Sequence, residues 1–488
     1  MTPQEIASYY KESQEFLQER KRRQVKQLVL LNNLQRGDQN IASTLLLTLF
    51  NRSLSSLYDD KLQIKFLPSQ GITQNQINSY NILAQSDYLE MGKAKIDYDW
   101  VWDTLFFSRG YCETLQFDKK QKIMKPHVIN PLVFGYDPYF EEVQSWRYYW
   151  KWITKSKWDI LKLIKNGTIT GIKNLKEIPT GIDSYLWDYK VKRDAAKKAI
   201  EPPIDTVSGD IYQILEFYGY DEKGNKVVMW LDRGLDKILW KEKLDLKDSD
   251  DGTSKWPIVV KEAFREPHSS VVFSIADVLE DKHRAKSVLL NLAFLAAKDR
   301  ANPIYGYNPD KVKDISQFFQ RQINQHIPMD DESAAWPLNT QEPMSAGLIQ
   351  FISLLTQEAN EPLGTGMVMQ PLPGKQQTAT EAAITQQLND MAQSLQSKVL
   401  QFGEAEFWSH WFHRYAKNAK DLKTKIANIV GVKGVDSKEI DLKDFNTDFP
   451  PGIFVYSAKE AQYKELVMRR DLMQLYPNLA ETIGPEGM

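Results

Sequence analysis

The strongest candidate for metal chemistry in the sequence is a pair of histidines on a long helical stretch. His410 and His413 are three residues apart and Glu406 precedes His410 by four, so all three side chains could share one helix face and ligate a metal ion. Trp408 and Trp411 crowd the same segment. Because no second motif of this kind occurs in the chain, we favour an aromatic packing face with partly exposed histidines over a metal site.

A glycine-rich loop at residues 364–377 suggests phosphate binding, because it ends in Gly374 and Lys375 ahead of a helix. A P-loop needs glycine five residues before Gly374 and serine or threonine after the lysine, where this chain has Met369 and Gln376. Met369 also occupies the position of the third glycine in a dinucleotide fingerprint, and no strand precedes the loop. We therefore predict no nucleotide site.

Other chemistry-bearing residues are scattered. Asp330, Asp331 and Glu332 form an acidic tip that lacks the alternation and the glycine of a calcium loop, so we expect a solvated or partner-facing surface there. No Gly-x-Ser-x-Gly motif occurs. A catalytic triad from distant segments stays open, because its members need not be sequence neighbours. We predict no enzyme activity, no cofactor and no metal.

The composition is that of an ordinary globular protein. The 488 residues are 42% hydrophobic and 26% charged, and 62 Lys and Arg nearly balance 64 Asp and Glu. Such a balance excludes DNA binding through overall charge, so any nucleic-acid contact must be local or loose. Cys112 is the only cysteine and is expected to be a small buried side chain. Residues 1–19 do not resemble a secretory signal, and we expect a soluble protein.

The spacing of apolar residues predicts helices at both ends of the first half of the chain's order. Residues 3–58 are expected to be helical with a break near Gly37, and they carry a basic cluster that we expect to be a solvated helix face, with contact to DNA or an anionic neighbour as the minority reading. This cluster comprises Arg20, Lys21, Arg22, Arg23 and Lys26. A strand at 62–67 and a helix at 74–91 follow. Residues 100–145 are expected to be rich in strands, and 212–220 with 226–232 to form a β-hairpin.

The character of the chain changes at Ser274. Ser274 and Asp277 match a helix start, and the predicted helix runs to about Ala301, ahead of Pro303. Its second half, 288–297, is apolar nearly all round, at about half the ~20 residues that a membrane span needs. Apolar residues on every side indicate neighbours on several sides, as in a ring of packed helices. A core helix of one monomeric domain is the alternative.

The order of elements after Ser274 resembles that of the portal proteins of tailed phages, most closely those of short-tailed phages. Local patterns agree with this resemblance: residues 102–111 (WDTLFFSRGY), then Ile-Asn-Pro at 129–131 and Tyr-Asp-Pro at 136–138, resemble the portal wing. The segment 274–303 resembles the first stem helix, and 378–383 (TATEAA) resembles the start of the helix after the tunnel loop.

The resemblance implies an α+β portal fold: a mixed α/β wing, a two-helix stem, a small α/β clip, a tunnel loop and a long helix. The crown is reduced or missing. The implied divisions, in chain order, are a wing (1–273), stem helix 1 (274–302), the clip (303–343), stem helix 2 (344–363), the tunnel loop (364–377), the long helix with a return to the wing (378–457), and a C-terminal helix with at most a short crown (458–488).

The resemblance also implies a function. It implies a homo-oligomeric ring, usually a dodecamer, at one capsid vertex of the virion, assembled in the host cytoplasm, through which double-stranded DNA is packaged and ejected. Lys375, Gln376 and Gln377 would then lie nearest the DNA, and Asp330, Asp331 and Glu332 would bind partners. Those partners are the terminase large subunit, head-tail adaptor or tail proteins, and the major capsid and scaffolding proteins, with no membrane. The alternatives are another head-tail connector or adaptor ring, or a carboxylate-dependent hydrolase or nuclease.

Overall fold

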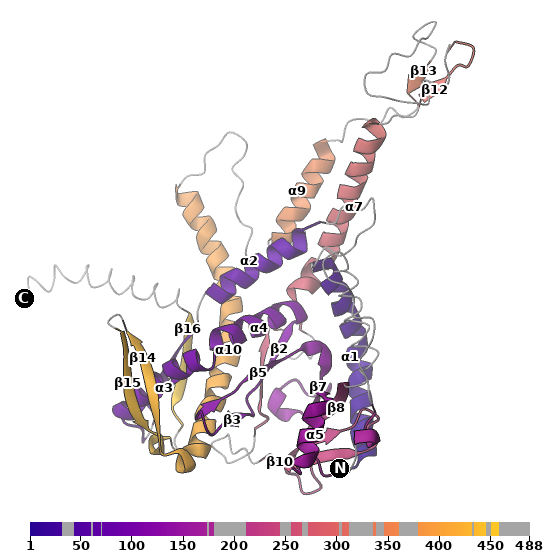
Figure 1. The fold of residues 1–488 in the computed structure, drawn as a ribbon. Coiled ribbons are helices and arrows are strands. Elements are labelled where there is room, and N and C mark those ends of the chain that lie inside the picture. Colours follow the sequence, from indigo (N-terminus) through magenta and orange to yellow (C-terminus); the bar gives the residue numbers. More distant parts are fainter. Residues whose placement is uncertain are drawn as a thin grey trace, which may run out of the picture.

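A computed structural model describes most of the chain. The described residues are 1–31, 43–59, 62–69, 71–172, 175–179, 211–244, 255–265, 272–301, 305–311, 335–337, 346–360, 379–431, 434–445 and 450–457. The structure combines helices and strands in a globular body, from which one helix pair projects (Figure 1). The predicted mixed helix-and-sheet class is therefore confirmed.

The helices carry the framework of the molecule. Their bounds are α1 Pro3–Leu31, α2 Leu45–Asp59, α3 Gln74–Glu90, α4 Lys93–Phe107, α5 Lys157–Lys165, α7 Ile275–Ala301, α9 Ala346–Asn360 and α10 Ala379–Leu422. The predicted helices at 3–58, 74–91, 274–301 and 345–363, and the long one from 378, all agree with these bounds to within a few residues. The expected final helix and the expected short helix at 312–325 lie outside the described residues.

The strands form one large sheet and several small ones. Their bounds are β1 Leu62–Leu67, β2 Arg109–Glu113, β3 Phe117–Asp118, β4 Ile123–Met124, β5 His127–Ile129, β6 Phe134–Tyr136, β7 Tyr149–Ser156, β8 Ile211–Tyr220, β9 Lys226–Leu231, β10 Ile238–Lys243, β11 Ile258–Glu262, β12 Tyr305–Tyr307, β13 Ala335–Pro337, β14 Thr424–Gly431, β15 Gly434–Asp441 and β16 Gly452–Ser457. Five antiparallel strands pair in the order β10-β9-β8-β7-β6, and β11-β2-β5 form a second sheet. The predicted hairpin is confirmed, since β8 pairs with β9 around the turn at 221–225.

Strands that are distant in the sequence unite the body. β1 pairs with β16 near the opposite end of the described chain, and β11 pairs with β2. α10 passes through the same region and buries Phe407, Trp408 and Trp411 against α3 and α4. The segment after the helix pair therefore returns to the body formed by the first half of the chain.

Two expectations about the first half are wrong. The segment at 100–107 is the end of helix α4 rather than part of a strand-rich region, and the chain leaves this helix through Ser108 at a φ of 72°. Lys21 does not lie on a solvated face: it is buried and donates to the carbonyl of Phe134 at 2.6 Å, because α1 packs against β6. Arg22 and Lys26 of the same cluster are exposed, as predicted. Cys112 is fully buried, also as predicted.

None of the helices in the described ranges combines the length and the apolar character that crossing a bilayer requires.

Candidate functional site: the projecting helix pair and the anchor of the long helix

The first helix of the projecting pair begins at a well-formed cap. The Ser274 hydroxyl accepts from the Asp277 backbone N–H at 3.0 Å, and the Asp277 carboxylate accepts from the Ser274 N–H at 3.0 Å. This reciprocal pair satisfies backbone donors that a helix start leaves unpaired. The helix start predicted from these two residues is therefore confirmed.

The base of α7 is fixed to the body by an ionic cluster around Glu280. The Glu280 carboxylate accepts from Arg23 and Gln27 at 2.9 Å each and from Arg284 at 2.8 Å. Burial alone would raise the pKa of Glu280, but these hydrogen bonds and the positive charge of Arg23 outweigh it and lower the pKa below its ordinary value. One end of α7 is thus held rigidly while the rest projects.

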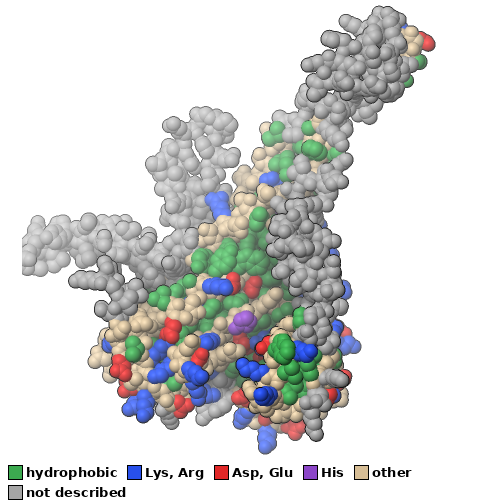
Figure 2. All heavy atoms as spheres, in the orientation of Figure 1, with side chains coloured by type: hydrophobic (Ala, Val, Ile, Leu, Met, Phe, Trp, Pro, Cys, Tyr) green, Lys and Arg blue, Asp and Glu red, His purple; other side chains and the backbone are tan. Residues whose placement is uncertain are grey.

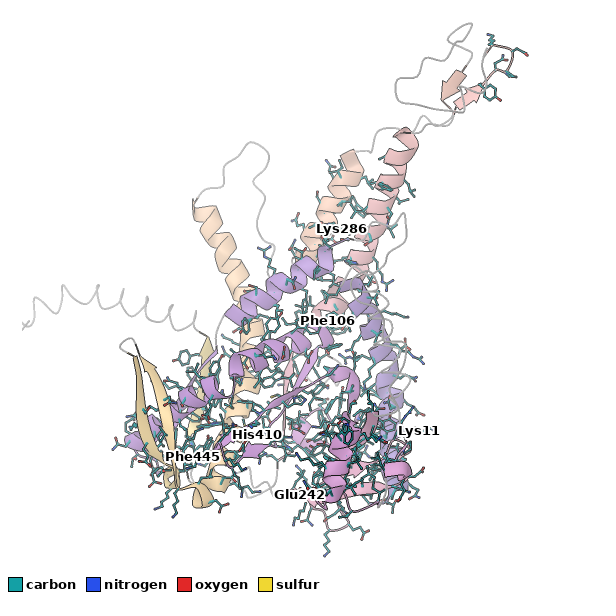
Figure 3. All side chains as sticks on the ribbon, viewed as in Figure 1. Lys11, Phe106, Glu242, Lys286, His410 and Phe445 are labelled. Atoms are coloured by element: carbon teal, nitrogen blue, oxygen red, sulfur yellow. The ribbon has the colours of Figure 1, made fainter. Side chains whose placement is uncertain are left out.

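The two helices of the pair are joined by lysines of α7. Lys286 donates from Nζ to the Thr356 hydroxyl at 2.8 Å, and Lys282 donates to the carbonyl of Glu358 at 2.6 Å. Lys286 lies between α7 and α9 in Figure 3. Near the base of the pair, Ala359 of α9 is fully buried in the same apolar cluster as Leu279 of α7. These contacts make α7 and α9 one structural unit.

Beyond this contact the helix pair exposes large apolar side chains on more than one side. On α7 the exposed set includes Val288 at 57% and Leu292 at 53%, and on α9 Ile349 at 53% and Phe351 at 50%. The further members are Phe294, Leu295 and Leu354. Figure 2 shows hydrophobic side chains continuing from the pair down over α2. Soluble monomers rarely expose contiguous apolar surface of this kind, so the patch indicates a protein contact.

The long helix α10 is anchored in the body by a buried carboxylate between two lysines. Glu404 accepts from Lys93 of α4 at 2.7 Å and from Lys261 of β11 at 2.8 Å, and the Trp408 indole N–H donates to it at 2.8 Å. Lys93 also pairs with Asp97. All three central side chains are almost completely buried. Because this cluster joins residues more than 300 positions apart, it fixes α10 against the first half of the chain.

Electrostatics keep this cluster ionised. Burial would raise the pKa of Glu404, but the charges and hydrogen bonds of Lys261 and Lys93 overcome this and lower the pKa to about 2. Burial likewise opposes the charge on Lys93, yet the carboxylates of Asp97 and Glu404 raise its pKa above the usual value. Glu404 is therefore a carboxylate, and Lys93 an ammonium, throughout the neutral range.

A second buried carboxylate holds the far end of α10. Asp87 of α3 accepts from the Trp411 indole N–H at 2.9 Å, from the Tyr415 hydroxyl at 2.6 Å and from Lys425 at 2.6 Å. The rings of Trp411 and Tyr415 pack against Phe445 in the same apolar cluster. With Glu404, this group holds the last third of the helix at two levels.

The histidine motif proves to be part of the packing. His410 and His413 are buried, at 0% and 3% exposed, and this corrects the expectation of partly exposed histidines. His410 Nδ1 lies 2.8 Å from the Thr114 hydroxyl, whereas Glu406 interacts with Gln144. Burial and the nearby charge of Arg414 hold the pKa of His410 well below its usual value. His410 lies inside the body (Figure 3), and no group of three potential metal ligands occurs among the described residues.

The other residues predicted to act lie outside the described part of the chain. These are Lys375, Gln376 and Gln377 of the expected tunnel loop, and Asp330, Asp331 and Glu332 of the expected acidic tip. Their roles stay predictions. β12 and β13, which flank the acidic tip in sequence, pair beyond the far end of α7 (Figure 1).

Sequence reasoning missed the Lys93–Glu404–Lys261 cluster. Its members are spread over three separate elements, and no spacing rule connects them. The one local signal is Gly403 inside a helix, because a Cβ there would lie 2.6 Å from Cγ of Lys261 and 3.1 Å from the carbonyl oxygen of Val260. A helical glycine of this kind indicates close approach of another backbone.

Comparison with known proteins identifies the family. The family model described as the phage SU10 portal protein matches residues 211–486, which include the helix pair, the long helix and the strands that follow it. No curated protein matches the sequence. Since the matched segment is more than half of the 488 residues, the chain belongs to the phage SU10 portal protein family.

Proposed function

We propose that copies of this portal protein assemble into a ring, usually a dodecamer in this class of protein, at one vertex of the capsid. Double-stranded DNA would pass through the central channel during packaging and ejection. The protein itself would be structural, with the force supplied by a separate motor, because no nucleotide motif occurs in the sequence. The site of action is the virion, after assembly in the host cytoplasm.

The observation that carries this proposal is the two-sided apolar surface of the α7–α9 pair. A closed ring needs two different contact faces on every subunit, because each copy touches one neighbour on either side. Val288, Leu292 and Ile349 are each more than half exposed in the single chain, and burying such side chains between subunits stabilises by roughly 1.5–3 kcal/mol each. A monomeric enzyme has no use for this surface.

The channel assignment rests on the connection between α9 and α10. Residues 361–378 join the projecting pair to the anchored long helix, and the resemblance makes 364–377 a tunnel loop. Lys375, Gln376 and Gln377 would be the residues nearest the DNA, with Lys375 making transient phosphate contacts. A channel that lets a duplex slide must avoid tight phosphate binding, and the near-neutral composition of the chain is compatible with that requirement.

The segment 303–343 would be the docking platform. Asp330, Asp331 and Glu332 supply negative charge for basic surfaces of the terminase large subunit, and later of adaptor or tail proteins. The major capsid and scaffolding proteins would surround the body.

The test is deletion of residues 366–376. Because the deletion leaves α7, α9 and the anchored half of α10 intact, rings should still form, as measured by native mass spectrometry against the wild-type ring. The yield of DNA-filled heads should fall when the variant replaces the wild-type protein during infection. A normal yield of DNA-filled heads that retain their genome would rule out the tunnel role.

A further inference from the structure

The short helix α5 presents the most exposed large hydrophobic side chain among the described residues. Trp158 is 75% exposed, and Leu161, three residues later on the same helix, is 37% exposed. Neither side chain serves the core of the body, because both point away from it. An outward tryptophan next to an outward leucine is typical of the centre of a protein contact.

The helix holds this pair rigidly. Ser156 and Asp159 form a capping box: the Ser156 hydroxyl accepts from the Asp159 N–H at 3.3 Å and donates to the Asp159 carboxylate at 2.7 Å. On the opposite face Ile160 is fully buried in a cluster with Ile214 and Leu239 of the large sheet. Trp158 therefore stands on a helix whose orientation does not depend on it, and little ordering entropy remains to be lost on binding.

Positive charge surrounds the apolar pair. Lys162 and Lys165 are exposed and form no ion pair with any residue in the described ranges. The nearby negative charge, Asp159, is occupied by the cap, and the hydrogen bonds from Ser156 lower its pKa below the usual value. Figure 2 shows a cluster of hydrophobic side chains bordered by Lys and Arg at the lower right, where Figure 1 places α5.

The chemistry of this surface favours a protein over DNA or a membrane. A phosphate-binding surface would gain little from Trp158 and Leu161, and the two lysines lie in the last turn of α5, where the helix dipole is unfavourable for anions. The helix has nine residues with one aromatic anchor, which is short for an interfacial membrane helix. An acidic protein surface with an apolar recess matches both the tryptophan and the lysines.

We propose that α5 is the surface by which the portal ring is held in the capsid shell. Trp158 would insert into an apolar recess of the shell protein, and Lys162 and Lys165 would pair with carboxylates at its rim. The position of α5 agrees with this role, because it lies at the end of the body remote from the α7–α9 pair and from β12 and β13 (Figure 1). This inference rests on the proposed portal function and adds the partner of one defined surface.

The first test is Trp158→Ala, alone and combined with Lys162→Glu and Lys165→Glu. Because these side chains are exposed, ring assembly and thermal stability should match the wild type. The fraction of heads that contain a portal ring should fall at least about 10-fold, the effect of losing some 1.4 kcal/mol of binding. Leu89→Ala, which truncates a 59%-exposed leucine on α3, is the matched control and should leave the fraction unchanged.

The outcomes separate this inference from the portal function. Variant rings that form normally and enter heads as often as the wild type overturn the α5 contact and leave the portal function standing. Failure of the wild-type protein to form rings refutes the portal function itself. Loss of ring formation by Trp158→Ala overturns the inference, because α5 would then contact a second copy of the chain.

A second test identifies the partner directly. A photoreactive benzophenone amino acid replaces Leu161, and heads isolated from infected cells are irradiated. A cross-link from position 161 to the shell protein, reduced by Lys162→Glu and Lys165→Glu and restored at low ionic strength with Trp158 intact, supports the proposal. Cross-links only to the scaffolding protein, to DNA or to a neighbouring portal subunit overturn it.

Discussion

At the scale of single residues, the arrangement around Glu404 decides how the long helix is held. One carboxylate receives hydrogen bonds from two lysines and a tryptophan, and aromatic rings cover the lysines: Lys261 lies 3.9 Å from the centroid of Trp100. A buried ion pair of this sort adds little net stability compared with apolar residues of the same shape, but removal of one partner strands the others. Its value here is that it fixes the position of α10.

Glu404→Gln should therefore be strongly destabilising. The substitution leaves two buried ammonium groups, Lys93 and Lys261, without their shared counter-charge, and we expect a loss of about 3–5 kcal/mol in the free energy of unfolding. Urea denaturation at fixed protein concentration measures it. Asp421→Asn, in the exposed Lys119–Asp421 pair at 65% exposure for both partners, is the control and should change the same quantity by less than about 1 kcal/mol. Equal effects of the two substitutions would refute the anchoring role.

The same carboxylate makes a prediction about pH. The pKa of Glu404 is about 2 in the folded protein against an ordinary 4.5, so its contribution is fully present above about pH 4.5 and is lost as the pH falls towards 2. The melting temperature of the wild type should decline across this window more steeply than that of Glu404→Gln. Parallel acid branches for the two proteins would show that Glu404 is not held ionised by its lysines.

Gly403→Ala offers a test in which two effects have opposite signs. In an open helix this substitution stabilises by up to about 1 kcal/mol, but here the new Cβ would meet Lys261 and the carbonyl of Val260. We expect net destabilisation of about 1–3 kcal/mol in the urea experiment, the usual effect of overpacking. A more stable variant would mean that α10 and β11 are not in close contact at this point.

At the scale of elements, the apolar faces of α7 and α9 are the surface on which ring formation depends. Leu292→Glu, or Ile349→Glu, places a charge at a side chain about half exposed in the single chain, so the subunit should fold normally while the ring is lost. Circular dichroism reports the fold and native mass spectrometry the assembly. Leu89→Glu, at 59% exposure on α3, should affect neither. Rings from the Leu292 and Ile349 variants would place the subunit contact elsewhere.

Local signals in the sequence were sufficient for most elements. The cap at Ser274 and Asp277 and the turn at 221–225 each set a boundary within a few residues, because short-range hydrogen bonds determine them. α4 was misread at 100–107: its aromatic residues favour strands by propensity, but they pack as a helix against α2 and α10. The β14–β15 hairpin was not predicted as a pair, and only the end of β15 was expected as a strand.

The side chains that matter for position were harder to predict than the elements. Lys21 and His410 are polar residues whose burial depends on contacts from distant segments, with the Phe134 carbonyl and Thr114 respectively. Lys93, Lys261 and Glu404 come together only after α4, β11 and α10 have packed. Sequence periodicity reports which face of an element is apolar, and it contains no information about such long-range polar partners.

At the scale of the whole molecule, a rigid body and a projecting helix pair have separate tasks. The body anchors α10 through Glu404 and Asp87, while the α7–α9 pair carries apolar surface that nothing among the described residues covers. A family of portal proteins provides the context in which this division is useful, since each copy must contact two neighbours and leave a channel between them.

Imaging of the purified protein by electron microscopy tests the central claim most directly. The account predicts closed rings, usually of twelve copies, each with a central hole and with the α7–α9 pairs of neighbouring subunits in contact. A compact monomer of 56.5 kDa with nuclease activity that depends on divalent cations would contradict it.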